Sequence, residues 1–367
     1  MDKNTNRPIS IFMPTLGGGG AERVMVMLAN SFASKGHSTH LVLMKASGPY
    51  LSEVDARVKI FDLNKTRMLF ALRALVLYLI NERPKCLLSA MNYANIIALA
   101  AVRLSNKKIR VVISERSSPS GYRNFKFQNI VLPLMRLMYP MANRIICVSE
   151  GVAKELQELV GVPYSKIDVI PNPLDIKSIS LAMDDVITHP WILDPAKKVI
   201  LAVGRLSDEK SYETIIHAMV NIREHNDAVL IILGEGYRRP ALEKLVQKLK
   251  LEEHIEMPGF DANPFPLMNT CDAYVLCSRT EGFPNSLVQA MACGAPVIST
   301  DCHHGPREIL EGGKYGTLVP VGSPEMLANA IIQAFSCGAH KHARKKAEEY
   351  SVDGIVNRYL RVLGVPV

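Results

Sequence analysis

The sequence lacks the features that mark a disulfide-stabilised, zinc-binding or membrane-spanning protein. Its seven cysteines are odd in number and form no C-x-x-C pair, so we expect neither a disulfide framework nor a zinc site, and a reducing compartment fits best. The longest apolar run, residues 68–80, contains Arg73 and is too short to span a bilayer. The first residues, MDKNTNRP, lack the apolar region of a signal peptide. We therefore expect a cytoplasmic protein.

The composition is that of a globular protein with an uneven distribution of charge. The chain has 367 residues, of which 48% are hydrophobic and 21% are charged, and this length favours two domains. Residues 1–175 contain 23 Lys and Arg against 12 Asp and Glu, a net charge of +11, whereas residues 176–367 have a net charge of −3. Two halves of opposite charge are expected to meet different partners.

Strand-like runs alternate with amphipathic helical segments along the whole chain. Such alternation predicts two parallel sheets with helices on both faces, and such sheets bind ligands at the carboxyl ends of their strands. The segment 171–195 has few periodic runs and is predicted to connect the two halves, with some local helix. In the first half we expect strands at 9–14, 39–44, 86–90, 111–114, 144–148 and 167–170, and helices at 21–35 and about 151–159. In the second half we expect strands at 199–203, 229–233, 255–257, 273–277 and 296–299, and helices at 212–223 and 239–249.

Four consecutive glycines, residues 17–20, follow the first predicted strand and precede a helix. Glycine lets a ligand approach the main chain closely, and the helix N-terminus beyond it offers free N–H groups to an anion. Gly18 and Gly19 are therefore candidate phosphate-binding residues. The turn is not the dinucleotide fingerprint, because the third glycine position falls at Glu22. The alternative is a flexible turn without a ligand.

A second strand-to-helix turn has the sequence V-G-R-L-S-D-E-K, residues 203–210. It places Arg205 and Lys210 between the end of a strand and the start of a helix. Two cations at this place suit a diphosphate, since they can neutralise charge that develops on a leaving group. The alternative is a pair of solvated surface cations.

Residues 273–300 have the pattern strand, turn, helix, strand. Pro284 fits the first turn of the helix and Gly294 fits the residue after its end. Glu281 lies in the turn, where a carboxylate can accept hydrogen bonds from sugar hydroxyls. Gln289 lies in the helix and could face the same crevice. A capping or surface role is the alternative for Glu281.

These motifs together resemble glycosyltransferase family 4. The resemblance rests on P-N-P-L-D at 171–175, G-R-L-S-D-E-K, G-E-G at 234–236, E-G-F-P and A-C-G-A-P-V-I-S-T. The opening T-L-G-G-G-G-A-E-R and D-C-H-H-G-P-R-E-I at 301–309 are similar to bacterial enzymes that assemble lipid-linked oligosaccharides and surface polysaccharides. The matches run in colinear order from residue 15 to residue 310.

The resemblance implies the GT-B fold, which consists of two Rossmann-like, doubly wound α/β domains that face one another across a cleft. An acceptor-binding domain is expected at 1–175 and a domain that binds the nucleotide sugar at 176–345. The segment 346–367 is expected to pack back on the N-terminal domain. The resemblance also implies retention of the anomeric configuration and no catalytic metal or other cofactor. This sequence accordingly has no D-x-D motif.

The resemblance assigns roles to individual residues of this sequence. Arg205 and Lys210 would bind the donor diphosphate and Glu281 the donor sugar, and these three are the expected catalytic residues. Glu115, Arg116 and Asn172 are expected at the acceptor or the cleft. The other residues expected to bind the nucleotide sugar are Gly18, Gly19, Gly234, Phe283, Pro284, Asn285, Ser286 and Gln289.

Two positions depart from the family pattern. Gln289 stands where the family has a glutamate that holds the ribose hydroxyls, and a neutral acceptor makes a weaker bond than a charged one. Glu115 and Arg116 stand where many relatives have a histidine. A further motif, Asp301–His304, contains metal-ligand types, but neighbouring residues in an extended segment point to opposite sides. A loop that lines the donor pocket is the favoured interpretation there.

The segment 122–144 mixes basic and aromatic residues with an apolar face, and 66–83 is similar in style. This mixture suits an anionic membrane surface, with a core helix carrying ordinary surface cations as the alternative. No recognisable nucleic-acid-binding module is present, so nucleic acid is not an expected partner. A peripheral position on the inner face of the cytoplasmic membrane would bring the enzyme to a polyprenyl-linked acceptor.

The sequence therefore predicts a glycosyltransferase with a nucleotide diphosphate sugar, expected to be UDP-linked, as donor. Two other functions stay open. A nucleotide-sugar epimerase on the same architecture would need no second substrate. The neutral Gln289 also allows a non-catalytic protein that binds a sugar nucleotide, although a protein of that kind has no need of a diphosphate clamp.

Overall fold

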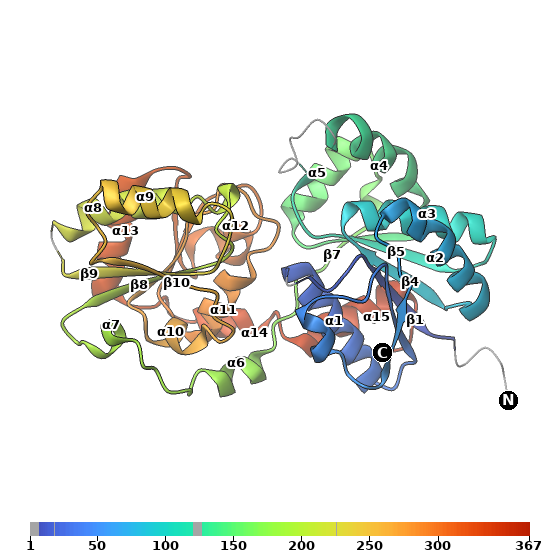
Figure 1. Cartoon of the computed structure of the whole chain (residues 1–367), viewed down its shortest axis with the longest axis horizontal. Helices are drawn as coiled ribbons and strands as arrows, with labels where there is room; N and C mark the ends of the chain where they lie inside the picture. The colour runs from blue at the N-terminus through green and yellow to red at the C-terminus, as the bar shows by residue number, and fades with distance from the viewer. Residues whose placement is uncertain (1–6, 18, 120–126, 225) are drawn as a thin grey trace. The chain divides into compact units, whose positions relative to one another are not determined.

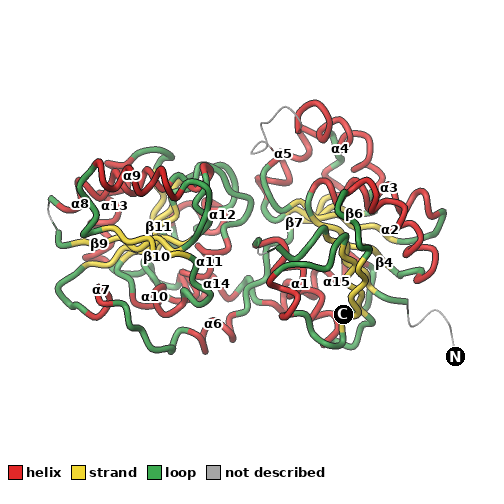
Figure 2. The backbone as a smooth tube through the Cα atoms, in the orientation of Figure 1, coloured by secondary structure: helices red, strands yellow, loops and turns green. Residues whose placement is uncertain are grey.

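The chain folds into two compact units. The computed structural model describes residues 7–17, 19–119, 127–224 and 226–367 (Figure 1). Unit 1 comprises Met1–Pro173 and Val352–Val367, and unit 2 comprises Leu174–Ser351. In each unit the strands form a central layer with helices on both faces, as Figure 2 shows in yellow and red.

Unit 1 is built on a parallel sheet of seven strands in the order β3-β2-β1-β4-β5-β6-β7. Every residue of the inner strands β1, β2 and β4 is buried, as a parallel sheet covered on both faces requires. The strands are β1 Ile9–Met13, β2 Thr39–Leu43, β3 Val58–Asp62, β4 Cys86–Ala90, β5 Arg110–Glu115, β6 Arg144–Cys147 and β7 Ile167–Val169.

The helices of unit 1 form two layers. One layer contains α1 and α15, and both bury apolar side chains in the same core cluster as the sheet. On the other face, α2 and α3 bury Leu75, Leu79, Ala94 and Ala98 against Phe12 and Val42. The main helices are α1 Gly20–Ser34, α2 Met68–Glu82, α3 Asn92–Ser105, α4 Leu132–Met138, α5 Glu150–Val160 and α15 Val352–Leu363.

The C-terminal helix α15 completes the core of unit 1 from the far end of the sequence. Its buried face consists of Ile355, Val356, Tyr359, Leu360 and Leu363. These residues recur at intervals of three and four, which places them on one side of a helix. The chain therefore leaves unit 1 after Pro173 and returns to it at Val352.

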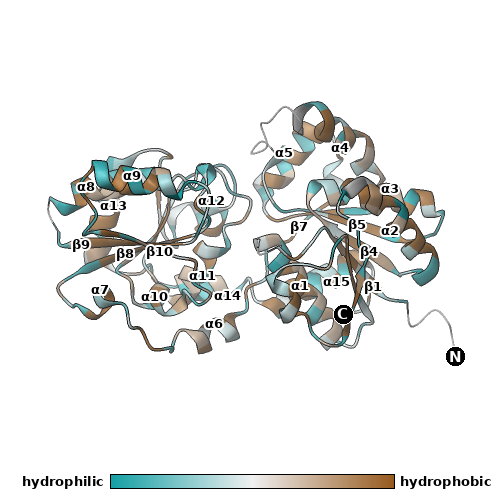
Figure 3. Ribbon diagram, viewed as in Figure 1, coloured by the Kyte–Doolittle hydropathy of each residue, from teal (hydrophilic) through white to brown (hydrophobic). Residues whose placement is uncertain are grey.

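Unit 2 repeats the design with a parallel sheet of six strands in the order β10-β9-β8-β11-β12-β13. Figure 3 shows the hydrophobic character of these strands in brown. The strands are β8 Lys198–Val203, β9 Ala228–Leu233, β10 Ile255–Gly259, β11 Ala273–Leu276, β12 Val297–Thr300 and β13 Thr317–Val319.

Two apolar clusters cover the faces of this second sheet. One is formed with α8, α9 and α13, and the other with α6, α10, α11 and α14 (Figure 1). The helices are α6 Ile176–Ala182, α7 Pro190–Leu193, α8 Tyr212–Arg223, α9 Arg239–Lys248, α10 Phe265–Thr270, α11 Asn285–Cys293, α12 Pro306–Ile309, α13 Pro324–Cys337 and α14 Ala343–Glu348.

The expected strands and helices are present, with ends within two residues of the expected ones. The predicted connection contains the short helices α6 and α7. Two strands were missed. β3 lies at an edge of its sheet with mostly exposed or half-exposed residues, and β13 has only three residues. Neither offers the buried apolar run by which the other strands were recognised.

Candidate functional site

The strand order of unit 2 identifies one end of the sheet as a binding site. The chain moves outward from β8 to β9 and β10 on one side, and through β11, β12 and β13 on the other. Parallel sheets bind ligands where the order reverses, outside the carboxyl ends of the two central strands. Arg205 lies two residues beyond the end of β8, and Glu281 follows β11. Two of the predicted catalytic residues therefore flank this reversal point.

The turn that contains Arg205 is pressed against the turn after β9. A Cβ atom on Gly234 would lie 1.9 Å from the carbonyl oxygen of Gly204, and one on Gly236 would lie 2.2 Å from that of Leu206. Gly234 also has a φ angle of +144°, which residues other than glycine rarely adopt. The predicted site residue Gly234 therefore has a packing role, because it allows the two turns to come into backbone contact.

Lys210 and Glu281 form an ion pair at the same end of the sheet. Lys210 Nζ lies 2.5 Å from Glu281 Oε1, and the two side chains are only 19% and 11% exposed. Burial works to lower the pKa of Lys210, but the charge of Glu281 and its hydrogen bond outweigh burial, so that pKa is raised. Lys210 is thus charged at neutral pH. An open position is expected for Lys210 as for Arg205, whereas the side chain of Lys210 is largely covered and paired with Glu281.

Arg205 differs from Lys210 in its surroundings. It is exposed, and among the described residues no side-chain hydrogen bond or ion pair reaches its guanidinium. A guanidinium can bind two oxygens of a phosphate at once. Arg205 is therefore the cation of this site that is available to an anion without first releasing a partner.

The N-terminus of α11 lies at the same end of the sheet, after Pro284. Within the part of the chain that the structure describes, no side chain caps this helix, so its first N–H groups and its dipole favour a negatively charged ligand. Asn285, Ser286 and Gln289 are partly exposed, and their spacing of three and four residues places them along one side of the helix. Gln289 therefore shares a helix side with the residues expected to bind the nucleotide sugar.

Phe283 lies in the turn before α11 but contacts the protein interior. Its ring packs edge-on against Tyr350, with 5.3 Å between the ring centroids. Gly305 approaches the same turn so closely that a Cβ atom would lie 2.7 Å from Pro284 Cδ. The side chain of Phe283 thus supports the turn.

The loop after β12 contains the two histidines of the D-C-H-H segment. Their rings lie 5.8 Å apart, and they line a hollow of about 550 Å³ together with Arg279 and Arg307. Among the described residues, no group of three or more His, Cys, Asp and Glu is placed to hold a metal ion. The backbone oxygen of His303 accepts a hydrogen bond from the N–H of Glu281 at 3.3 Å, so this loop supports the turn that contains Glu281.

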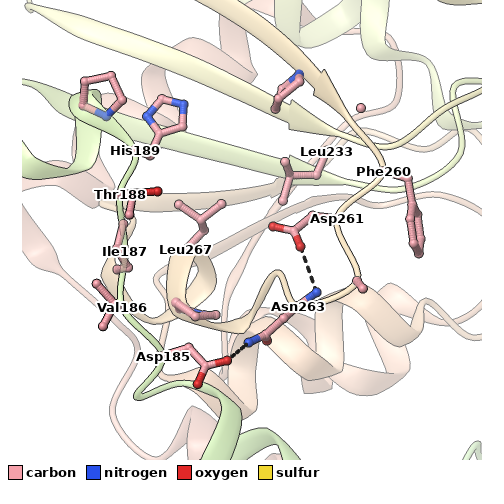
Figure 4. A pocket seen from close by; sticks show the side chains of 15 residues that line it. Asp185, Val186, Ile187, Thr188, His189, Leu233, Phe260, Asp261, Asn263 and Leu267 are labelled. Atoms are coloured by element: carbon pink, nitrogen blue, oxygen red, sulfur yellow. Dashed lines mark hydrogen bonds between the residues drawn. The ribbon is translucent and has the colours of Figure 1, made fainter.

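A second hollow, of about 610 Å³, lies beside the carboxyl ends of β9 and β10 (Figure 4). One wall is the segment 185–190 of the connection, and another is the loop 258–263. Asn263 links the two walls, since its Nδ2 donates to Asp185 Oδ2 at 2.7 Å. Sequence reasoning missed this hollow, because its walls are about 70 residues apart in the sequence. Only the sequence D-A-N-P at 261–264 indicated a turn there.

In unit 1, the glycine turn follows β1 at the corresponding reversal point, between β1 and β4. Gly18 lies outside the described residues. Gly19 is the N-cap of α1, and the turn is packed tightly, since a Cβ atom on Gly48 would lie 2.1 Å from the oxygen of Leu16. Met91, directly after β4, has φ +79°, and such strain in a non-glycine residue is often found at functional sites.

Glu115 is not on a cleft surface, which corrects the sequence-based expectation of an acceptor contact. Its side chain is buried and accepts hydrogen bonds at Oε1 from Asn95 Nδ2, at 3.0 Å, and from the hydroxyl of Tyr139. Burial raises the pKa of Glu115 to about 7, although these two hydrogen bonds work to lower it. The physical reason is that the side chain of Glu115 points towards Asn95 of α3 and not out beyond the carboxyl end of the sheet.

Arg116 and Asn172 do meet, but in an internal connection. Arg116 donates through Nη2 to Asn172 Oδ1 and through Nη1 to the hydroxyl of Tyr359. These contacts tie the end of β5 to the P-N-P segment and to α15. Arg116 therefore connects the end of the first stretch of unit 1, next to Pro173, with the C-terminal helix α15.

The segments with mixed basic and apolar character lie on one layer of unit 1. Residues 120–126 are outside the described part of the chain, so Tyr122, Arg123, Phe125 and Lys126 cannot be placed. In what is described, no helix is both long and apolar enough to cross a membrane. Among the described residues, the exposed large apolar side chains of α2, α3, α4 and their flanks are Phe70, Leu77, Met91, Tyr93, Leu104, Ile130, Leu134, Leu137 and Met141.

Comparison with known protein families gives two adjoining matches. Residues 18–178 match the family described as Glycosyltransferase Family 4, and residues 185–351 match Glycosyl transferases group 1. The boundary between the matches, at residues 178–185, falls shortly after the start of unit 2 at Leu174.

Individual relatives and solved structures agree with these matches. The chain is 32% identical, over 88% of each protein, to the N-acetylgalactosamine-N,N'-diacetylbacillosaminyl-diphospho-undecaprenol 4-alpha-N-acetylgalactosaminyltransferase of Campylobacter jejuni. It is 25% identical to the lipopolysaccharide core biosynthesis glycosyltransferase LpsE of Rhizobium meliloti, over 94% of this chain and 96% of that protein. The structure of Anabaena HepE in complex with UDP has a TM-score of 0.81 at 19% identity, covering 97% of this chain and 99% of that one. The GT-B fold is thereby confirmed.

Proposed function

Because the chain belongs to glycosyltransferase family 4, we propose that it transfers a hexose or an N-acetylhexosamine from a UDP-linked donor with retention of anomeric configuration. The acceptor is a lipid-linked or polysaccharide glycan of the cell surface. The observation that carries the proposal is the gathering of Arg205, Lys210, Glu281 and the uncapped N-terminus of α11 at the reversal point of one sheet.

The electrostatics of this site suit a nucleoside diphosphate as leaving group. Arg205 offers an unengaged guanidinium, and the N-terminus of α11 offers N–H groups and a positive dipole end. Both would stabilise the negative charge that grows on the diphosphate as the bond to the anomeric carbon breaks. Preorganised stabilisation of this kind is usually the largest catalytic contribution.

The proposed reaction needs no separate base. The acceptor hydroxyl attacks the anomeric carbon from the face on which the diphosphate departs, and the leaving phosphate oxygen takes the acceptor proton. Glu281 accepts hydrogen bonds from hydroxyls of the donor sugar and so fixes the position of the anomeric carbon. No cofactor or metal ion is part of this proposal.

The donor and acceptor classes come from the relatives. HepE is solved with UDP, and the titles of related HepE structures include UDP-glucose. The Campylobacter relative acts on an undecaprenol-linked substrate by its name, and the Rhizobium relative is named for lipopolysaccharide core biosynthesis. A UDP-sugar and a lipid-linked glycan are therefore the substrates to test first.

A lipid-linked acceptor also gives a role to the basic character of unit 1. Residues 66–144 contain 13 Lys and Arg but only two Asp and Glu, and one of these, Glu115, is buried. Within this stretch α2, α3 and α4 pack side by side and expose both large apolar side chains and cations such as Arg73 and Arg103. We propose that this layer docks on the anionic surface of the cytoplasmic membrane.

A panel of nucleotides tests the donor assignment directly. UDP, GDP, UDP-glucose, UDP-galactose and the two UDP-N-acetylhexosamines are added singly to the protein, and the melting temperature is measured. A ligand of the native state raises the melting temperature with its occupancy, so a selective rise with UDP compounds is expected. No rise with any UDP compound would contradict the proposal.

Product analysis then separates the proposed transfer from the alternatives. A transferase gives a glycosylated lipid acceptor and free UDP, whereas an epimerase converts the nucleotide sugar when no acceptor is present. Binding of a UDP-sugar without either product would point to a non-catalytic sugar-nucleotide binding protein.

A further inference from the structure

Ser278 has a buried hydroxyl that is hydrogen-bonded to a carboxylate. It follows β11 by two residues and is fully buried. Its Oγ donates a hydrogen bond of 2.7 Å to Glu281 Oε1. Ser299 in β12, another buried serine at this end of the sheet, donates instead to the backbone oxygen of Thr300, at 2.9 Å. A backbone bond is a common way to satisfy a buried serine, whereas the hydroxyl of Ser278 is joined to the carboxylate of a proposed site residue.

The two donors that reach Glu281 converge on one of its oxygens. Oε1 accepts from Lys210 Nζ at 2.5 Å and from Ser278 Oγ at 2.7 Å. Among the described residues, no hydrogen bond is recorded for Oε2. An ionised carboxylate has about four acceptor positions on its two oxygens. The carboxylate is therefore held by one oxygen, and the other remains for a ligand.

The position of Ser278 is itself fixed from two sides. Thr300 Oγ1 in β12 donates to the backbone oxygen of Ser278 at 2.5 Å. The thiol of the preceding residue, Cys277, donates to the backbone oxygen of Lys210 at 3.1 Å. Thr300 of the buried strand β12 thus holds Ser278, and Ser278 holds the carboxylate of Glu281. The same carboxylate binds Lys210, whose backbone oxygen is held by Cys277.

We infer that Ser278 is a positioning residue, which together with Lys210 orients Glu281 so that Oε2 accepts from a hydroxyl of the donor sugar. The inference rests on the proposed function of this site. Ser278 acts on the sugar only through Glu281, and among the described residues no hydrogen bond joins its side chain to Arg205 or to the N-terminus of α11. Its effect should therefore appear in recognition of the sugar and not in recognition of UDP.

Ser278→Ala tests this separation. Without this hydrogen bond to a charged group, the carboxylate of Glu281 is no longer held in the orientation proposed to meet the sugar, so the ratio of the dissociation constants of UDP-sugar and UDP should rise about tenfold. The affinity for UDP alone should stay within about twofold of the wild-type value. Turnover should fall by about tenfold as well. Calorimetric titration with UDP and with the UDP-sugar selected by the panel measures both constants.

Ser299→Ala is the matched control. It removes an equally buried hydroxyl from the same end of the sheet, but one that does not reach Glu281. It should leave the ratio of dissociation constants and the turnover unchanged. An unchanged ratio in Ser278→Ala, or an equal change in both variants, would overturn the positioning role.

A ligand-free crystal structure of Ser278→Ala distinguishes failure of this inference from failure of the proposed function. A carboxylate of Glu281 that rotates or takes several orientations in that variant supports the role of Ser278. An unmoved carboxylate overturns it. If the wild-type protein binds no UDP compound, the proposed function fails, while the crystal structure still decides whether Ser278 orients Glu281.

Discussion

Two glutamates occupy similar places in the two units, yet their surroundings make them different chemical groups. Glu115 ends β5 in unit 1, and Glu281 follows β11 in unit 2. Glu281 forms an ion pair with the ammonium of Lys210. Glu115 is buried between the neutral groups of Asn95 and Tyr139, and its pKa is raised to about 7. A position at a strand end therefore suggests a site, but the partners decide whether the carboxylate serves a ligand or the core.

The largest losses of activity are expected for the cations beside the proposed leaving group. Arg205→Ala and Lys210→Ala should each lower turnover by about 10²-fold or more. The first removes the exposed cation proposed to stabilise the departing diphosphate, and the second removes a cation at the same end of the sheet that also holds Glu281. Steady-state kinetics with the preferred UDP-sugar measures this. Near-normal turnover in both variants would show that the diphosphate assignment is wrong.

The same two variants should differ in their free energy of unfolding. Arg205→Ala should leave the free energy of unfolding unchanged, since its guanidinium is exposed. Lys210→Ala should lower it by about 2 kcal/mol, because Glu281 would remain as a largely covered charge without its partner. Urea unfolding of both variants provides the comparison.

Glu115→Gln should change how stability depends on pH. The carboxyl group of Glu115 has a pKa of about 7 in the folded protein, above its ordinary value near 4.5. The folded state therefore holds a proton that the unfolded state releases, so stability is full below pH 4.5 and falls as the pH rises towards 7. The loss should be about 3 kcal/mol at pH 8.

Glutamine keeps the oxygen that accepts from Asn95 and Tyr139 but cannot ionise. Relative to wild type, Glu115→Gln should therefore gain about 3 kcal/mol between pH 4.5 and pH 8. Urea unfolding of both proteins at several pH values provides the test. Parallel pH profiles would show that Glu115 does not titrate in this range. The corresponding change Glu281→Gln should instead lower activity, because this carboxylate is proposed to contact the sugar.

The contrast between the charges of the two units can be tested on vesicles. Arg73→Glu with Arg103→Glu should weaken binding to anionic vesicles by roughly 2 kcal/mol or more, since each cation near such a surface contributes about 1 kcal/mol. Raised salt should weaken the wild-type protein similarly. Lys244→Glu with Lys248→Glu, on exposed positions of α9 in unit 2, is the matched control and should bind normally. Equal wild-type binding to neutral and anionic vesicles, or none to either, would contradict the docking proposal.

The smallest expected effect concerns the ribose contact. Gln289→Glu restores the charge of the family residue on the exposed side of α11, and should tighten UDP binding by a few fold, since charged acceptors make stronger hydrogen bonds. Its effect on turnover should be smaller than that of Glu281→Gln. Titration of UDP against wild type and variant measures it, and an unchanged affinity would remove Gln289 from the site.

The sequence by itself determined the class of fold and most of its elements. Buried strands such as β9, Ala228–Leu233, are continuous apolar runs, and helices such as α8, Tyr212–Arg223, have a clear period of buried residues. These signals are local, because one stretch of chain contains all the information. The same holds for the motif residues Arg205, Lys210 and Glu281, which the strand order then brings to one end of a sheet.

Only the tertiary structure decided which groups are partners. Lys210 and Glu281 are 71 residues apart, Arg116 and Tyr359 are 243 apart, and the walls of the hollow in Figure 4 come from separate segments. It also decided that Glu115 points into the core and that Ser278 reaches a carboxylate. The physical reason is that burial, charge pairing and side-chain direction depend on what packs against a residue, and those neighbours come from distant parts of the chain.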